Sequence, residues 1–183
     1  RDPYPVVTDD GHVVFMIDAY TIAATYPYSE RYTGSYTEFV GANYIRNSIK
    51  IVVDAYDGSV DFYTVDSQDP LIRTYDNMFP GLIRPFEEMP ADIRRHMRYP
   101  VGLLTAQAEV YSTYHMRNPE VFYQREDVWE FATERYRDDF QRVEPYYVLT
   151  EFPDGGRLEF LNILPFTPKN KNVINAWIAG RSD

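Results

Sequence analysis

Three aspartates surround the clearest turn in the chain. Asp54, Asp57 and Asp61 lie in the run VVDAYDGSVDFY, where Asp57-Gly58 is a strong two-residue turn signal between stretches rich in β-branched and aromatic residues. A two-residue loop places Asp54 directly opposite Asp61, where like charges repel. This face must therefore be solvated, neutralised by Lys50 or an arginine, or built to hold a cation. Because DAYDG lacks the alternating carboxylates and final glutamate of an EF-hand loop, a cation here would occupy an irregular site.

Four tyrosines recur in a stretch that is rich in serine and threonine. Tyr26, Tyr28, Tyr32 and Tyr36 fall in a region without a helical or strand period. If exposed, their rings would form a contact surface for a sugar or a protein, because tyrosine combines an apolar ring with a polar hydroxyl. If folded back, they would close the edge of a sheet. The candidate binding residues are therefore Tyr26, Tyr28, Tyr32, Tyr36, Asp54, Asp57 and Asp61.

Signals for the common catalytic and cofactor sites are absent from the sequence. The chain has no cysteine, and its three histidines, His12, His96 and His115, lack the four-residue spacing of helical zinc ligands. It contains no G-x-S-x-G nucleophile motif, no P-loop and no dinucleotide-binding fingerprint. We therefore predict no catalytic residue, no metal ligand and no cofactor, and we favour a non-enzymatic role over an enzymatic one.

The candidate residues are predicted to lie on and between two hairpins. Strands at 6–7 and 12–17 flank the turn cluster DDG, and residues 21–41 read as an ordered loop with a helical turn. In the second hairpin a two-residue loop pairs Val53 with Phe62. One face then carries five apolar residues, and we expect this face to meet the core: Ile49, Ile51, Val53, Val60 and Phe62.

The middle of the chain reads as helices that begin at prolines. They are predicted from Asp69-Pro70 to before Pro80, over 90–97, over 100–114 and over part of 118–136, because proline suits the first turn of a helix. The alternating charges of residues 135–142 read as a solvated connector.

The last third returns to strands and sets the fold class. Residues 146–152 and 158–164 surround Asp154-Gly155-Gly156 as a third hairpin, and a final helix is predicted from Thr167 to Gly180. Its inward stripe would be Val173, Ile174, Trp177 and Ile178. We predict one α+β domain over residues 1–183, with strands within 4–66, helices within 69–140, and strands and a C-terminal helix within 145–180. Its antiparallel sheet is built from hairpins at both ends of the chain, with the helical middle segment packed on one side.

Charge restricts the classes of partner. The chain has 183 residues, 28 acidic against 18 basic side chains and a net charge of -10. Binding to nucleic acid needs clustered lysine and arginine, so that function is excluded. Anionic lipid headgroups are disfavoured as partners for the same reason. No segment approaches the roughly 18 apolar residues of a membrane span, and the chain, which opens on Arg1 without an initiator methionine, reads as a piece of a longer protein.

Short motifs along almost the whole chain resemble one known family. They are RDPYP, DAYT, YPYS, NYIRNS, VVDAYDG, FPGL, MPADIRRHMRYP, YHMRNPEVFYQREDVWE, EPYYV, LPFTP and the closing AGRSD, in this order. The resemblance is to uncharacterised protein family 0182, whose members look like bacterial multi-spanning membrane proteins with a large extracytoplasmic region. It implies that this chain is part of that region, located at the cell membrane. The membrane spans are absent from this chain, and the family pattern continues beyond its end.

The resemblance supplies a location and no activity, cofactor or catalytic residue. We therefore expect an extracytoplasmic interaction or structural domain that docks on the remainder of the parent membrane protein, on a second copy of it, or on cell-envelope components. One alternative is a module that binds cell-envelope saccharide through its tyrosines and the acids of the second hairpin. Another is an enzyme that acts on envelope glycan or a lipid-linked substrate.

Overall fold

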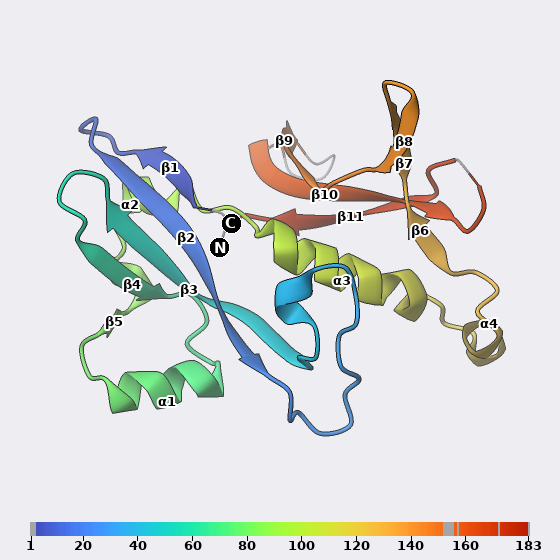
Figure 1. Cartoon of the computed structure of the whole chain (residues 1–183). Coiled ribbons are helices and arrows are strands. Elements are labelled where there is room, and N and C mark those ends of the chain that lie inside the picture. Colours follow the sequence, from blue (N-terminus) through green and yellow to red (C-terminus); the bar gives the residue numbers. More distant parts are fainter. Residues whose placement is uncertain (1–2, 152–155, 157, 172, 183) are drawn as a thin grey trace. The chain divides into compact units, whose positions relative to one another are not determined.

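A computed structural model describes residues 3–151, 156, 158–171 and 173–182 (Figure 1). The chain divides into two compact units, of which the first comprises residues 1–33 and 38–97 and the second residues 34–37 and 98–183. The single domain expected over residues 1–183 is not tested by this division and stays a prediction.

The first unit is built on a five-stranded sheet. Its strands follow the order β1-β2-β3-β4-β5, with the bounds Tyr4–Val7, Val13–Ala23, Tyr44–Asp54, Val60–Thr64 and Ile83–Arg84. The first four strands are antiparallel, and β5 runs parallel to β4. Both predicted hairpins are confirmed. The turn of the first contains Gly11 at φ +84°, a backbone conformation that favours glycine.

The second hairpin has a different register from the one predicted. Residue Val53 pairs with Val60, and Val52 pairs with Asp61, because the connection Ala55–Ser59 is longer than a two-residue loop. The prediction that Val53 pairs with Phe62 and that Asp54 lies opposite Asp61 is therefore wrong. The Asp57-Gly58 signal marks the turn correctly, but it does not give the length of the loop.

The core lies on the other face of this hairpin. The buried cluster comprises Tyr4, Val6, Val14, Met16, Val52, Tyr63, Met89 and Ile93. The predicted core face is wrong, since Ile49, Ile51, Val53 and Phe62 are only half-buried and Val60 is 46% exposed. Both faces of β3 carry apolar residues, so alternation shows which residues share a face but not which face is covered. The charge of Lys50 on the buried face is met by Asp18 across the strand pair.

Helix α1 of the first unit (Pro70–Met78) begins where the sequence places it. The side chain of Asp69 caps it by accepting a hydrogen bond from the amide of Leu71. The predicted helix over 90–97 is shorter, because α2 spans only Ala91–Arg94. Two 3-10 turns, η1 (Thr37–Phe39) and η2 (Phe86–Glu88), complete the helical elements before α3, and η1 is the helical turn expected in the loop.

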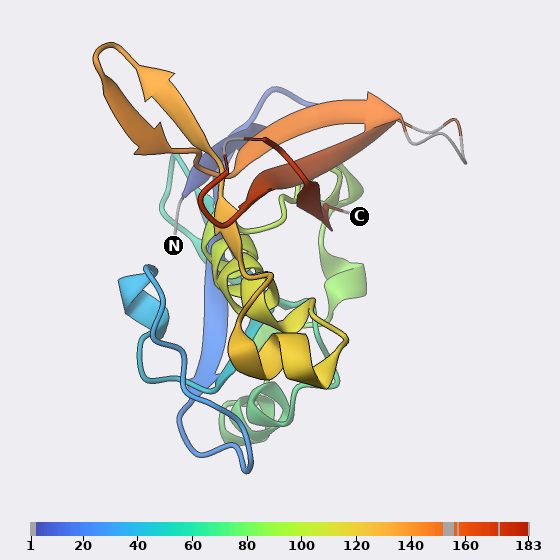
Figure 2. The ribbon, with the colours of Figure 1, turned by 90° about the vertical axis from the view of Figure 1, so that its right-hand side faces the viewer.

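The second unit packs one helix on a four-stranded sheet (Figures 1 and 2). Helix α3 (Val101–Tyr114) lies along β10 (Leu158–Pro168), which pairs with β11 (Ala176–Arg181) on one side and with β6 (Trp129–Phe131) and β9 (Tyr146–Glu151) on the other. The core between helix and sheet contains Leu104, Ala108, Leu164 and Phe166. Helix α4 (Pro119–Gln124) is capped by Asn118, and the predicted hairpin of β9 and β10 is confirmed. Its expected turn residues Asp154 and Gly155 lie outside the described residues.

Two predictions in this unit are wrong. Residues 176–181 form strand β11 and not the end of a helix: Phe166 pairs with Ala176, and Leu161 pairs with Arg181. The predicted inward stripe is therefore not one face: in the strand Ile178 and Ala176 face α3, Trp177 faces the opposite side, and Val173 and Ile174 are exposed before the strand begins. Residues 135–142 are not a connector, because β7 (Thr133–Tyr136) and β8 (Asp139–Arg142) form a hairpin that extends from the unit in Figure 2.

These elements confirm the α+β class. The hairpins at the two ends of the chain contribute to separate sheets, one in each unit, and α3 packs on one side of the second. No helix among the described residues is long and apolar enough to cross a membrane.

Replacing Gly180 with alanine is expected to destabilise the second unit. A Cβ atom at this position would lie 2.3 Å from two ring carbons of Tyr99. This ring cannot move freely, because its hydroxyl donates to Gln107 (2.7 Å) and the carbonyl of the same residue accepts from Tyr147 (2.7 Å) and Asn162 (3.2 Å). We expect a loss of about 2–3 kcal/mol in the free energy of unfolding, measured by urea denaturation.

A double-mutant cycle identifies the ring as the cause. Tyr99→Leu removes the aromatic obstacle, so Gly180→Ala should cost clearly less in that background than in the wild type. Equal costs in both backgrounds would contradict the steric explanation.

Candidate functional site: a tyrosine loop held by Asn43

The loop that follows β2 is closed by the side chain of Asn43. Its Oδ1 accepts from the amide of Tyr26 (3.0 Å), and its Nδ2 donates to the carbonyls of Tyr26 (2.9 Å) and Ser29 (3.1 Å). The amide of Asn43 donates to the carbonyl of Ala23 at the end of β2 (2.9 Å). One side chain thus fixes three backbone groups of the loop. We call the segment from Tyr26 to Ser29 the tyrosine loop.

The tyrosine loop presents two rings to solvent. Tyr26 is 55% exposed and Tyr28 is completely exposed, with the backbone of Tyr28 at φ +58°. Few residues other than glycine adopt this left-handed conformation. The ring of Tyr26 stacks on that of Tyr44, with centroids 5.8 Å apart and planes inclined by 24°. The ring of Tyr26 is therefore held in a defined position, and the backbone of Tyr28 has a fixed conformation.

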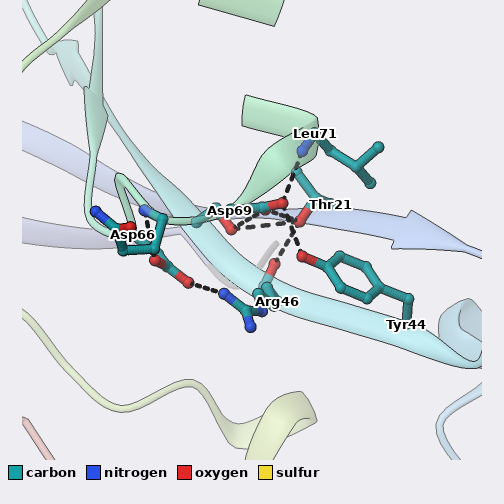
Figure 3. A network of polar contacts seen from close by, with 8 residues as sticks. Thr21, Tyr44, Arg46, Asp66, Asp69 and Leu71 are labelled. Atoms are coloured by element: carbon teal, nitrogen blue, oxygen red, sulfur yellow. Dashed lines mark hydrogen bonds and ion pairs between the residues drawn. The ribbon is translucent and has the colours of Figure 1, made fainter. Parts of the chain in front are cut away.

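Tyr44 is in turn held by a buried carboxylate (Figure 3). Its hydroxyl donates to Oδ1 of Asp69 (2.8 Å), which also accepts from the amide of Leu71 (2.9 Å). The other carboxylate oxygen accepts from the hydroxyls of Ser48 (2.5 Å) and Thr21. Asp69 has no exposed surface. This Asp69 cluster joins β2, β3 and the start of α1 beneath the tyrosine loop.

The hydrogen bonds determine the charge state of the Asp69 cluster. Burial by itself raises the pKa of Asp69, but the bonds from Ser48, Thr21, Tyr44 and the Leu71 amide outweigh it, and the pKa lies below its ordinary value. Burial and the bond to this carboxylate raise the pKa of Tyr44. The pair is thus an ionised acceptor and a neutral donor near neutral pH.

A charged pair lies beside the stacked tyrosines. The guanidinium of Arg46 lies 5.5 Å from the centroid of the Tyr44 ring, and its NH1 donates to Oδ2 of Asp66 (2.7 Å; Figure 3). This bond is the main cause that raises the pKa of Arg46. The arrangement combines aromatic faces with fixed charged groups and offers a surface for binding.

The other two candidate tyrosines have packing roles. Tyr32 is buried, with its ring 6.4 Å from that of Phe39, and its amide donates to the carbonyl of Ala42 (2.7 Å). Tyr36 belongs to the second unit, where its ring occupies the space that a Cβ atom of Gly102 would fill. The four tyrosines therefore do not form one surface, and only Tyr26 and Tyr28 stay candidates for contact.

The three candidate aspartates are not brought together as a cation site. Asp54 accepts from the amides of Tyr56 (2.7 Å) and Asp57 (3.1 Å) and bonds to His12 (2.5 Å), and these contacts lower its pKa. Asp57 accepts from the amide of Ser59.

Asp61 has a different partner, Arg84, at 2.9 Å. Among the described residues, no group of three or more carboxylates and histidines is arranged to hold a metal ion. The hypothesis of a cation between Asp54 and Asp61 loses its geometric basis, since Asp61 lies opposite Val52.

Sequence reasoning missed most of the residues that hold the tyrosine loop. The sequence pattern predicts only that a helix begins at Asp69-Pro70, and it gives Tyr44, Arg46 and Asn43 no role in a site. Their convergence depends on a bulge in β2, where the pairing with β3 shifts between Ala19 and Thr21. A local sequence pattern does not encode that shift.

Comparison with known proteins places the chain in a family. The model of the Uncharacterised protein family (UPF0182) matches residues 1–183. The UPF0182 proteins of Methanospirillum hungatei, Desulforamulus reducens and Pelotomaculum thermopropionicum are 50%, 47% and 48% identical to the chain and cover all of it. The chain spans about one fifth of the length of these relatives. No solved structure matches it. The resemblance seen in the sequence is thus confirmed, and the chain belongs to the UPF0182 family.

Proposed function

We propose that the chain is a non-enzymatic interaction domain of a longer membrane protein and that the tyrosine loop is its contact surface. The observation that carries this proposal is the exposure of Tyr26 and Tyr28 on a backbone that Asn43 holds in place. A tyrosine offers a large contact area with few rotatable bonds, so two tyrosines on a fixed backbone lose little entropy on binding. Exposed aromatic rings in a fixed loop are typical of recognition surfaces.

The charges around the loop favour binding over catalysis. A general base needs a pKa near the working pH and a free position for the proton that it accepts. The carboxylate of Asp69 instead has a lowered pKa and four donors, and Asp66 is paired with Arg46. These two acids therefore hold Tyr44 and Arg46 in place.

The proposed partner is the remainder of the parent protein or a second copy of it. The relatives are about five times as long as the chain, so most of each protein lies outside this segment. The resemblance to multi-spanning membrane proteins supports a location outside the cytoplasm at the cell membrane. In that setting the tyrosine loop would dock on another extracytoplasmic part of the assembly.

The arrangement of Tyr26, Tyr44 and Arg46 supports a second candidate, a module that binds cell-envelope saccharide. Aromatic faces stack on the apolar side of a sugar ring, and charged groups beside them bind its hydroxyls. The stacked rings of Tyr26 and Tyr44 lie next to the guanidinium of Arg46, which supplies such a group. A saccharide partner would use the same loop, so one set of variants tests both candidates.

Removing the two exposed rings is expected to weaken binding without unfolding the chain. The double variant Tyr26→Ala/Tyr28→Ala should lower the affinity for the partner by at least about tenfold, since buried tyrosines at interfaces are frequent hot spots. Asn43→Ala keeps both rings but frees the loop, and it should give an intermediate loss. Affinity is measured between the labelled chain and the full-length protein in detergent, and separately with cell-wall glycan fragments.

The matched control is Tyr75→Ala, which removes a half-exposed tyrosine from α1. It should leave binding unchanged. A photoreactive phenylalanine at position 28 of the full-length protein should form an adduct with another part of the protein or a second copy, and the same group at position 75 should not. An adduct with glycan would select the saccharide module, whereas wild-type affinity of the double variant in both assays would refute both candidates.

A further inference from the structure

The exposed lysines of the chain are confined to one connection. The sequence contains three lysines, and Lys50 is buried in the ion pair with Asp18. The other two, Lys169 and Lys171, are exposed on the connection between β10 and β11. Neither has a carboxylate partner among the described residues. In a chain with a net charge of -10, this is a local concentration of unpaired positive charge.

Large apolar side chains are exposed on the same connection and at the start of β11. Val173 is 70% exposed, Ile174 63% and Trp177 54%. Trp177, in the second position of β11, lies on the sheet face opposite to the residues that pack on α3. The basic-apolar cluster, as we call Lys169, Lys171, Val173, Ile174 and Trp177, therefore brings two cations and three exposed apolar side chains together within residues 169–177.

The connection that bears the first four residues of this cluster is anchored at both ends. The amide of Lys169 donates to the carbonyl of Val128 (3.2 Å), and that of Lys171 donates to the carbonyl of Pro168 (3.0 Å). The amide of Asn175 donates to the carbonyl of Phe166 (2.9 Å). These bonds hold the cluster on the sheet without using its side chains.

We infer that the basic-apolar cluster docks on the surface of an anionic phospholipid bilayer. Lysines next to a membrane are attracted by anionic headgroups, while apolar side chains enter the boundary between headgroups and acyl chains. Tryptophan is enriched at that boundary because its ring is apolar and its N–H is polar. The cluster supplies all three elements, and a bilayer accepts them without the matched shape that a folded partner requires.

The net negative charge of the chain by itself predicts repulsion from an anionic bilayer. This net charge, however, averages over the whole surface. Charges are screened over about 8–10 Å at physiological salt, so docking depends on the groups near the lipid. One carboxylate contacts the connection: Oε2 of Glu130 accepts from the amide of Asn170 (3.4 Å). This acid reduces the attraction but is not paired with either lysine.

Co-sedimentation with vesicles tests the inference. The chain should bind vesicles of mixed phosphatidylglycerol and phosphatidylcholine, and added salt should weaken this binding. Vesicles of phosphatidylcholine alone should bind clearly less. Lys169→Glu/Lys171→Glu and Ile174→Asp should each reduce partition to anionic vesicles by at least about tenfold. Since these side chains are exposed, the variants should keep the wild-type circular dichroism and melting temperature.

Two controls separate the cluster from other surfaces. Phe140→Asp introduces the same charge at a residue that is 69% exposed on the β7–β8 hairpin, and it should bind vesicles as the wild type does. Tyr26→Ala/Tyr28→Ala should also do so, which makes this test independent of the proposed function. Three results would each overturn the inference. The first is equal binding to both lipid compositions, and the second is binding that Ile174→Asp does not change. The third is self-association of the chain that Ile174→Asp abolishes, with no binding to lipid.

Discussion

The variant Asp69→Ala is expected to lose about 3–5 kcal/mol of the free energy of unfolding, the magnitude found when a buried, hydrogen-bonded charge is deleted. The substitution leaves the hydroxyls of Thr21, Ser48 and Tyr44 and the amide of Leu71 without their acceptor. Each buried donor left without a partner costs about 1–3 kcal/mol, although neighbouring hydroxyls recover part of this by bonding to each other. Urea denaturation followed by circular dichroism measures the loss.

The same residue should make stability depend on pH in acid. Because the pKa of Asp69 is lower in the folded chain than its ordinary value of 3.8, the folded state favours the ionised form. Its contribution is fully present above 3.8 and is lost as the pH falls through the folded pKa. The Asp69→Asn variant should lack this part of the acid slope while keeping an oxygen for the helix cap.

Asp76→Ala is the control for the Asp69 variants, since it removes an exposed aspartate from the same helix. It should change stability little. If Asp69→Ala were no more destabilising than Asp76→Ala, the carboxylate would not join the strands and α1 as described.

The Asp69 cluster also shows what the sequence can and cannot predict. An aspartate before a proline at the start of an apolar-periodic run indicates a helix cap, and α1 begins there. The same local rules give α3 and the hairpins around Gly11 and Gly58. The convergence of Thr21 and Tyr44 on Asp69 needs the bulge in β2 and the register of β3, which are set by contacts between residues far apart in the chain.

The tyrosine and aspartate candidates show the same limit. Residue type identified Tyr26 and Tyr28 as candidates for a contact surface, and they are exposed, but it could not separate them from the packing residues Tyr32 and Tyr36. Burial depends on which surface covers a residue, and spacing does not contain that information. The wrong loop length between β3 and β4 likewise placed Asp54 opposite Asp61, because a change in register moves every pair along the hairpin.

The buried ion pair of Lys50 and Asp18 lies on the face of the sheet that is covered instead of the predicted core face. Deleting either partner is the second substitution with a large expected effect on stability. The side chains are 4% and 5% exposed, and the ammonium donates to Oδ1 of the carboxylate. Asp18→Leu alone leaves a buried ammonium without its carboxylate, and Lys50→Met alone leaves the carboxylate without its ammonium. We expect each single variant to lose about 3–5 kcal/mol of the free energy of unfolding.

The double variant Asp18→Leu/Lys50→Met should lose much less than the sum of the two single losses. Two apolar side chains of similar size need no desolvation of charge, so replacing a buried ion pair in this way is often nearly neutral. Urea denaturation of the wild type, the two single variants and the double variant gives the coupling free energy between the two positions. The exposed pair of Arg95 and Asp9 is the control, and its cycle should show little coupling.

The dependence on pH gives an independent measure of the buried ammonium. Burial lowers the pKa of Lys50 below its ordinary value of 10.5, and attraction to Asp18 opposes this shift. In Asp18→Leu the opposing attraction is gone, so the folded state binds the proton still less readily. Between the lowered pKa and 10.5 the unfolded state then carries more protons, and the stability of this variant should rise with pH. If the free energy of unfolding that Asp18→Leu loses stayed constant from neutral pH to 10.5, Lys50 would not be held in the core as a charged group.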